Sequence, residues 1–406
     1  MKRFLAILLA VVLVACTFAA CSGNKGKEAK PEENKEALKV GFIFLHDENS
    51  TYDKNFLDAA KAACDELGVE AVIKTNIDES AACTEAAAEL VDQGCKLVFA
   101  DSFGHEDFMI EAAKEFTDVQ FCHATGTKAH TEKLANYHNA FASIYEGRYL
   151  AGVAAGLKLN EIKEAGKLKG DVPKMGYVGA FTYAEVISGY TSFYLGAKSV
   201  CPDVVMDVQF TGSWYDETAE KEAAQTLINR DCDLISQHAD SMGAPTACET
   251  AGIPDVSYNG STAAQCPNTF IVSSRIDWAP YFKYIIDCVQ NGKEIDADWT
   301  GTLATGSVVL TEVNEKAAAE GTQAKIDEVK AALEDGSVKV FDTAKEGFIT
   351  VDGKAIDSYK ADVDTDANYE ADTEVVKDGF FHESEFRSAP YFDLRIDGIT
   401  LLNEKF

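Results

Sequence analysis

Strands and helices alternate along the chain from residue 38, and this alternation limits the possible folds more than any other feature. Residues 38–44 (LKVGFIF) form a predicted strand, and residues 55–67 then place apolar side chains at helical spacing. The alternation continues through predicted strands at 69–74, 96–100 and 119–122 and predicted helices at 81–93 and 106–116. Strands that alternate with helices form βαβ units, so we expect a parallel sheet.

A second series follows a small-residue helix at 146–159 and a polar crossover at 160–173. Its predicted strands are 174–179, 204–210, 234–237, 255–257 and 270–273, and its predicted helices are 184–198, 217–229 and 243–251. We therefore expect an α/β protein with two Rossmann-like lobes, lobe 1 at 38–155 and lobe 2 at 170–275. Segments after about residue 276, beginning with a helix at 278–290, are expected to cross back and complete lobe 1.

The chain ends in a predicted helix at 316–334 and a turn-rich C-terminal extension at 337–406. Within the extension, residues 362–370 alternate acidic side chains in the manner of a calcium-binding loop. Ala367 stands where such a loop needs glycine, and Thr373 stands where it needs glutamate. We therefore interpret this segment as a solvated acidic loop and expect no metal site.

The first residues have the pattern of an export signal. Lys2 and Arg3 precede an apolar run that is too short to span a bilayer and suits a signal peptide. Small residues then lead to Cys21, so we expect a lipoprotein signal peptide at 1–21 with Cys21 as the lipid anchor. Cys16 also fits such a lipobox, and an ordinary cleaved signal is the alternative. The Lys/Glu/Asn-rich residues 22–37 form a predicted flexible tether.

Charge and cysteine content exclude several classes of protein. The formal net charge is −30, which repels phosphate backbones, so we expect no nucleic-acid partner. Nine cysteines follow the leader without any CxxC spacing. An odd, scattered set argues against a disulfide framework and a zinc site, and we expect small buried apolar side chains instead.

Sequence signatures of common cofactor and catalytic sites are absent. The chain has no GxxxxGK[ST], no GxGxxG after a strand, no GxSxG and no HExxH. Its seven histidines have no metal-ligand spacing. We therefore expect no cofactor and no enzymatic activity.

Polar and aromatic side chains gather after the predicted strands, where ligands of open α/β sheets bind. Stacking faces combined with a few carboxylates and amides suit a flat heterocycle. The alternative is that the aromatic rings cover the sheet edge. The candidate ligand-binding residues are Asp47, Asn49, Thr51, Tyr52, Phe103 and His105 in lobe 1 and Phe181, Trp214, Asp240 and Asn259 in lobe 2.

Several longer segments resemble the basic membrane protein family of bacterial substrate-binding lipoproteins, also called PnrA-like. The matching segments are 39–42 (KVGF), 102–104 (SFG), 123–126 (HATG), 145–152 (YEGRYLAG), 212–216 (GSWYD), 237–241 (QHADS) and 386–391 (FRSAPY). The resemblance implies a type I periplasmic-binding-protein fold with a hinge. It also implies an ABC permease and ATPase as partners and a purine nucleoside or base as ligand. By position, Trp214 would stack on the purine and Asp240 would bond its polar edge or ribose.

Together these features predict a solute-binding lipoprotein of an ABC importer, held at the outer face of the cell membrane by lipid on Cys21. Its ligand would lie in the cleft between the lobes, which would close around it. Three alternatives remain open at this stage, of which one is a sensor or adhesin lipoprotein without a transporter. Another is a binding protein for another small solute, such as a sugar or a signalling molecule, because a fold does not set its ligand. The third is a nucleoside-processing enzyme.

Overall fold

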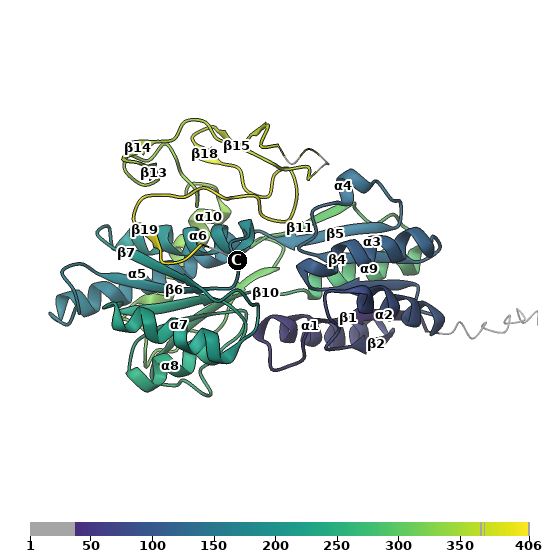
Figure 1. Cartoon of the computed structure of the whole chain (residues 1–406), viewed down its shortest axis with the longest axis horizontal. Coiled ribbons are helices and arrows are strands. Elements are labelled where there is room, and N and C mark those ends of the chain that lie inside the picture. The colour runs from purple at the N-terminus through teal and green to yellow at the C-terminus, as the bar shows by residue number, and fades with distance from the viewer. Residues whose placement is uncertain (1–36, 366–367, 369, 405–406) are drawn as a thin grey trace, which may run out of the picture. The chain divides into compact units, whose positions relative to one another are not determined.

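The computed structural model describes residues 37–365, 368 and 370–404. The predicted signal peptide at 1–21 with Cys21, and the tether at 22–37 apart from its last residue, lie outside them. Residues 37–406 form one compact unit, which contains two large sheets (Figure 1).

The first lobe is a parallel sheet of six strands covered by helices on both faces (Figure 1). Helices α1 (Thr51–Leu67) and α9 (Ala279–Asn291) pack against each other on one face, and α2 (Ala81–Asp92) and α3 (Glu106–Glu115) pack together on the other. In spatial order the strands are β11 (Asp298–Gly301), β5 (Tyr137–Ala142), β4 (Gln120–Ala124), β3 (Leu97–Ala100), β1 (Lys39–Ile43) and β2 (Glu70–Lys74).

The second lobe is built around a sheet of seven strands. Helices α7 (Glu217–Asn229) and α8 (Gly243–Ala251) pack together on one face, and α5 (Ile144–Glu164) and α6 (Ala184–Val200) on the other. Only β12 runs antiparallel to its neighbour. The order is β12 (Val308–Leu310), β10 (Phe270–Ile276), β9 (Asp255–Tyr258), β8 (Leu234–His238), β6 (Lys174–Gly179), β7 (Val205–Phe210) and β19 (Ile399–Leu401).

Helix α5 differs from the expected organisation. We assigned residues up to 155 to lobe 1, but α5 packs against α6 and β10, so the chain enters the second lobe at about residue 143. Glycines allow this packing: a Cβ at Gly152 would lie 2.0 Å from the carbonyl oxygen of Phe193. The small residues of this segment therefore allow α5 and α6 to pack closely, and they do not belong to the core of lobe 1.

Three chain connections join the lobes. They run from β5 to α5, from β10 to α9, and from β11 to β12. As expected, the segment after residue 276 returns to the first lobe, where α9 packs on α1 and β11 pairs with β5. The next strand, β12, goes back to the second lobe and pairs with β10. The sequence pattern did not reveal β5, β11 or β12.

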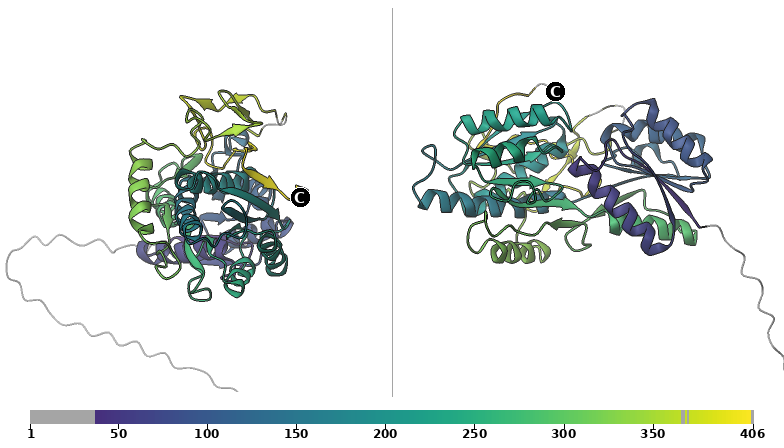
Figure 2. Two further views of the ribbon diagram at one scale, coloured as in Figure 1. Left: turned by 90° about the vertical axis from the view of Figure 1, so that its left-hand side faces the viewer. Right: turned by 90° about the horizontal axis from the view of Figure 1, so that it is seen from below.

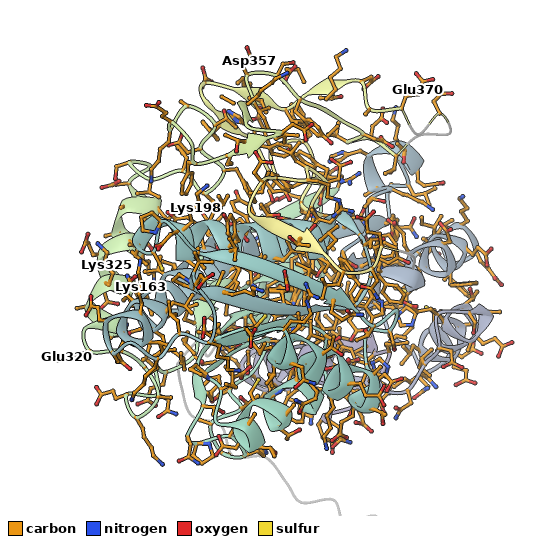
Figure 3. The ribbon with its side chains drawn as sticks, turned by 60° about the vertical axis from the view of Figure 1, so that its left-hand side comes forward. Lys163, Lys198, Glu320, Lys325, Asp357 and Glu370 are labelled. Atoms are coloured by element: carbon orange, nitrogen blue, oxygen red, sulfur yellow. The ribbon has the colours of Figure 1, made fainter. Side chains whose placement is uncertain are left out.

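The C-terminal extension packs on the second lobe and ends as part of its sheet (Figures 1 and 2). It follows helix α10 (Thr322–Glu334) and contains three two-stranded ribbons before β19 pairs with β7. Lys198 of α6, labelled in Figure 3, donates through Nζ to the carbonyl oxygens of Gly347 (2.8 Å) and Phe348 (3.0 Å). Phe341 and Phe392 of the extension stack at 4.3 Å and belong to the same apolar core as α5 and α6.

All nine cysteines of the described residues are buried and unpaired, as the sequence analysis expected. They act as small apolar side chains in the cores of both lobes. No helix in the described part of the chain is both long and apolar enough to cross a bilayer.

Candidate functional site

A pocket lies between the two lobes, at the ends of strands from both sheets. The pocket is lined by Leu45, His46, Tyr52, Asp53, Ser102, Phe103 and Thr125 from the first lobe and by Glu185, Trp214, His238, Asp240, Tyr258 and Asn259 from the second.

The start of helix α1 forms the first lobe's side of the pocket. Ser50 caps the helix by accepting the backbone N–H of Asp53. Burial alone would raise the pKa of Asp53, but hydrogen bonds from His46 and Ser50 lower it below its ordinary value. Tyr52 donates its hydroxyl to the carbonyl oxygen of Asp101 (2.8 Å), which fixes the ring at the pocket wall. This side therefore offers a held aromatic ring next to a buried carboxylate.

Aromatic side chains form one wall and the rim of the pocket. The ring of Trp214 meets the edge of Phe181 at 5.0 Å between centroids, and Phe181 stacks on Tyr183 at 5.1 Å. Across the cleft, Phe103 of the first lobe lies 5.1 Å from Tyr183. Phe103 and Tyr183 are both more than a third exposed, although they are large apolar side chains. A wall of this kind can hold a planar ring by stacking.

A carboxyl group lines the same pocket just after the end of β8. Asp240 is buried, and its Oδ1 accepts a hydrogen bond from Nδ2 of Asn259 (3.3 Å). Burial, together with the nearby charges of Asp53, Glu220 and Glu185, raises the pKa of Asp240 well above its ordinary value. Asn259 adopts a left-handed backbone with φ of 66°, a region that asparagine enters more often than most residues.

A chain of hydrogen bonds supports the floor of the pocket. Arg148 is fully buried in α5, and its Nη2 donates to the hydroxyl of Tyr177 (3.0 Å). Because a guanidinium only donates, the Tyr177 hydroxyl accepts from it and gives its own proton to Nδ1 of His238 (3.3 Å). Nε2 of His238 then carries the hydrogen that faces Glu185 (3.4 Å). Burial lowers the pKa of His238, consistent with a neutral ring in this chain.

Tyr258 completes the floor. The Tyr258 ring lies 4.4 Å from the His238 ring, between centroids. The guanidinium of Arg148 lies 5.0 Å from the centroid of the Tyr258 ring. The Tyr258 hydroxyl is buried and has no hydrogen-bond partner among the residues that the structure describes. An unpaired buried hydroxyl that lines a pocket is available to a ligand.

The structure brings together five of the ten candidate residues at the pocket: Tyr52, Phe103, Trp214, Asp240 and Asn259. The other five do not line it. Asp47 and Asn49 bond each other on the surface loop, and His105 is buried behind the sheet edge with Nε2 2.9 Å from the carbonyl oxygen of Ile77. Phe181 supports Trp214 from behind, and Thr51 contacts the backbone of Asp240 outside the pocket.

Several pocket residues were not among the ten candidates. Asp53 directly follows the candidate Tyr52, and His238 lies two positions before the candidate Asp240. Glu185 lies at the start of α6, and Tyr258 lies at the end of β9. These two residues come together at the pocket only when the chain folds. Within the described part of the chain, no three His, Cys, Asp or Glu side chains come together in a way that could hold a metal ion.

Three proteins of similar sequence are named as binding proteins for small solutes. A purine-binding protein of Brucella abortus is 34% identical over 276 residues, which cover 66% of this chain and 73% of that protein. A putative ABC transporter glucose-binding protein of Haloferax volcanii is 32% identical and covers 53% and 51%. An ABC transporter nucleoside-binding protein of Lactococcus lactis is 27% identical and covers 59% and 64%.

Solved structures confirm the expected fold. An ABC transporter solute-binding protein of Aeropyrum pernix matches with a TM-score of 0.63 at 19% identity, over 76% of this chain and 94% of that one. The two-lobed arrangement with parallel sheets is therefore that of the type I periplasmic solute-binding proteins. The family described as "ABC transporter substrate-binding protein PnrA-like" matches residues 43–340. This chain thus belongs to the PnrA-like family of ABC transporter substrate-binding proteins.

Proposed function

We propose that the chain binds a purine nucleoside or purine base in the pocket between its lobes and presents it to an ABC permease and its ATPase. The observation that carries the proposal is the pairing of the Trp214 wall with the buried carboxyl of Asp240 and its partner Asn259 in one pocket. A purine offers a flat face for stacking and ring nitrogens for in-plane hydrogen bonds. The names of the Brucella and Lactococcus relatives support this ligand class.

A sugar is the second candidate, because the Haloferax relative is named as a putative glucose-binding protein. Calorimetric titration of the purified protein with inosine, adenosine, hypoxanthine, adenine and glucose distinguishes the two. The proposal expects saturable binding of at least one purine compound and none of glucose. Binding of glucose alone would refute it.

The chain is not an enzyme, since the family consists of substrate-binding proteins, and this prediction is confirmed. ABC substrate-binding proteins work outside the cytoplasm, which fits the export signal expected in the first residues. We further propose that lipid on Cys21 holds the protein at the outer face of the cell membrane. Metabolic labelling with palmitate tests this: Cys21→Ser should abolish labelling and Cys16→Ser should leave it intact. The reverse result would move the anchor to Cys16.

A further inference from the structure

The C-terminal extension leaves the second lobe, contacts the first lobe at two points and returns to the second. The hydroxyl of Thr365 donates to the carbonyl oxygen of Thr127, in the loop after β4 (2.9 Å). The backbone N–H of Ser388 donates to Oδ2 of Asp298, the first residue of β11 (2.8 Å). Both acceptors belong to the first lobe. The extension therefore links the two lobes in addition to the three chain connections.

The extension is fixed to the second lobe on both sides of these two contacts. Before them, Lys198 of α6 donates to the carbonyl oxygens of Gly347 and Phe348. After them, β19 pairs with β7, and the side-chain amide of Asn403 bonds both the N–H (2.8 Å) and the carbonyl oxygen (2.9 Å) of Phe210. Because both sides are held, the middle of the extension cannot freely follow the first lobe if the lobes move apart.

Arg387 joins the two contact points to each other. Its guanidinium donates to the carbonyl oxygens of Ala389 (3.1 Å) and Pro390 (3.1 Å), just after the second contact point, and of Val363 (3.3 Å), just before the first. Arg387 is only 8% exposed, so these hydrogen bonds lie where water competes little. Two segments that are distant in sequence are thus held together as one piece.

The strap, as we call residues 363–365 together with residues 387–390, contacts the first lobe at a point that is not part of the hinge. Thr127 follows β4, and none of the three connections between the lobes leaves from β4. A rotation of the lobes about those connections would therefore move Thr127 relative to the second lobe. Hydrogen bonds are made within about 3.2 Å, so a small movement is enough to break this contact.

We propose that the strap restrains opening of the cleft, so that the two lobes stay close together when no ligand is bound. Lobes that are already close lose less free energy on closing around a ligand, which favours binding. The strap follows position 340, where the match to the family ends, so this restraint comes from outside the matched region. The proposal does not depend on the identity of the ligand, because it concerns the ligand-free protein.

Amide hydrogen exchange at Thr51 in the ligand-free protein, resolved to the residue by NMR, tests the proposal. The backbone N–H of Thr51 donates to the carbonyl oxygen of Asp240 in the second lobe (3.0 Å). As the first N–H of α1, it has no partner within the helix. Helix α1 lies on the opposite side of the molecule from the extension (Figures 1 and 2). Exchange at this amide therefore reports opening of the lobes at a distance from the strap.

Thr365→Val combined with Asp298→Ala removes both contacts of the strap with the first lobe and leaves the bonds of Arg387 in place. The double variant should exchange the Thr51 amide about tenfold faster or more, because two hydrogen bonds are lost from the closed form. Each single variant should give a smaller increase. The amide of Leu57 in the interior of α1 should keep its rate, which separates opening of the lobes from unfolding of the helix.

Thr350→Val combined with Asp393→Ala is the matched control, because it makes the same two side-chain changes within the extension. The Thr350 hydroxyl donates to Oδ2 of Asp397 (2.6 Å), and Oδ1 of Asp393 accepts from the hydroxyl of Tyr359 (2.7 Å). The control should leave exchange at Thr51 unchanged. An unchanged rate in the strap variant, or an equal increase in both variants, would overturn the inference. Neither result bears on the proposed function, which its own titration with purines tests.

Discussion

Thr51 of the first lobe donates its backbone N–H to the carbonyl oxygen of Asp240 in the second lobe, across 3.0 Å. Thr51 is the first residue of α1 after its Ser50 cap, so this N–H has no partner inside the helix. The side chain of the same Asp240 lines the ligand pocket. The contact therefore joins the lobes beside the pocket, and we expect it to stabilise the closed form of the protein.

Replacing Thr51 by proline should weaken ligand binding without harming the helix. Proline lacks the N–H and is well tolerated at the first position of a helix. Ser50 already has the extended backbone that a residue before proline requires, with φ of −76° and ψ of 126°. Loss of one hydrogen bond from the closed form is worth about 1 kcal/mol, or about fivefold in affinity by calorimetry.

Thr51→Val is the control for this experiment, because it keeps the N–H and removes only the hydroxyl. That hydroxyl lies 3.3 Å from the same carbonyl oxygen and makes the weaker contact. The valine variant should bind within about twofold of the unmodified protein. Equal loss of affinity in both variants would mean that the backbone contact does not stabilise the closed form.

Trp214→Ala should weaken purine binding by about tenfold or more. Stacking of a base on an aromatic ring is worth about 1–3 kcal/mol, and the neighbouring Phe181 is already stacked on Tyr183. Trp299→Ala is the matched control, since Trp299 packs on Tyr281 in the first lobe, away from the pocket. Calorimetry should show unchanged affinity for the control, and unchanged affinity for Trp214→Ala would remove Trp214 from the site.

The sequence pattern was informative wherever the local periodicity decides the structure. Predicted helices at 217–229 and 243–251 coincide with α7 and α8, and the predicted strand at 174–179 coincides with β6. The edge strands β11 and β12 were missed, since each is short and is defined by its pairing partner in a distant part of the chain. The helical pattern of α5 was found, but the lobe to which it belongs depends on its packing against α6.

The same distinction applies to the site. Trp214 and Asp240 could be chosen from their positions after strands, because parallel strands present their carboxyl ends at one edge. Glu185 and Tyr258 gain their roles only from neighbours that are distant in sequence, such as His238 and Arg148. His105 illustrates the opposite error: a polar residue after a strand can turn inward and bond the backbone.

Arg148→Lys should destabilise the protein strongly, although it keeps the charge. The guanidinium donates to the carbonyl of Ser257, the hydroxyls of Tyr177 and Ser236, and lies between three aromatic rings at 5.0–5.3 Å. Lysine cannot supply this planar fork and would leave buried acceptors unpaired. We expect a loss on the order of 3 kcal/mol in the free energy of unfolding, measured by chemical denaturation.

Arg230→Lys is the corresponding control on the surface. Nε of Arg230 pairs with Oδ2 of Asp207 at 2.9 Å, but the side chain is 46% exposed. Exposed ion pairs contribute between about 0 and 1 kcal/mol, so this change should have little effect. Similar losses in the two variants would show that burial does not increase the contribution of Arg148 to the free energy of unfolding.

Glu383 of the extension should make stability depend on pH. Burial raises the pKa of Glu383 from its ordinary value of 4.5 to about 8, while the neighbouring Ser188 hydroxyl and Arg387 charge oppose the shift. Between these two pH values the folded protein holds a proton that the unfolded chain has released. The contribution of Glu383 to stability is therefore fully present below pH 4.5 and is lost as the pH rises through 8.

Glu383→Gln keeps the shape of the protonated side chain and removes its titration. Denaturation at pH 5.5 and pH 8 should show a smaller decline for this variant than for the unmodified protein, by on the order of 2 kcal/mol. Glu385→Gln is the control: a hydrogen bond from Lys377 lowers the pKa of Glu385, so it stays ionised in both states over this range. The Glu385 variant should keep the original decline. An equally steep decline in Glu383→Gln would show that Glu383 is already ionised in its buried position.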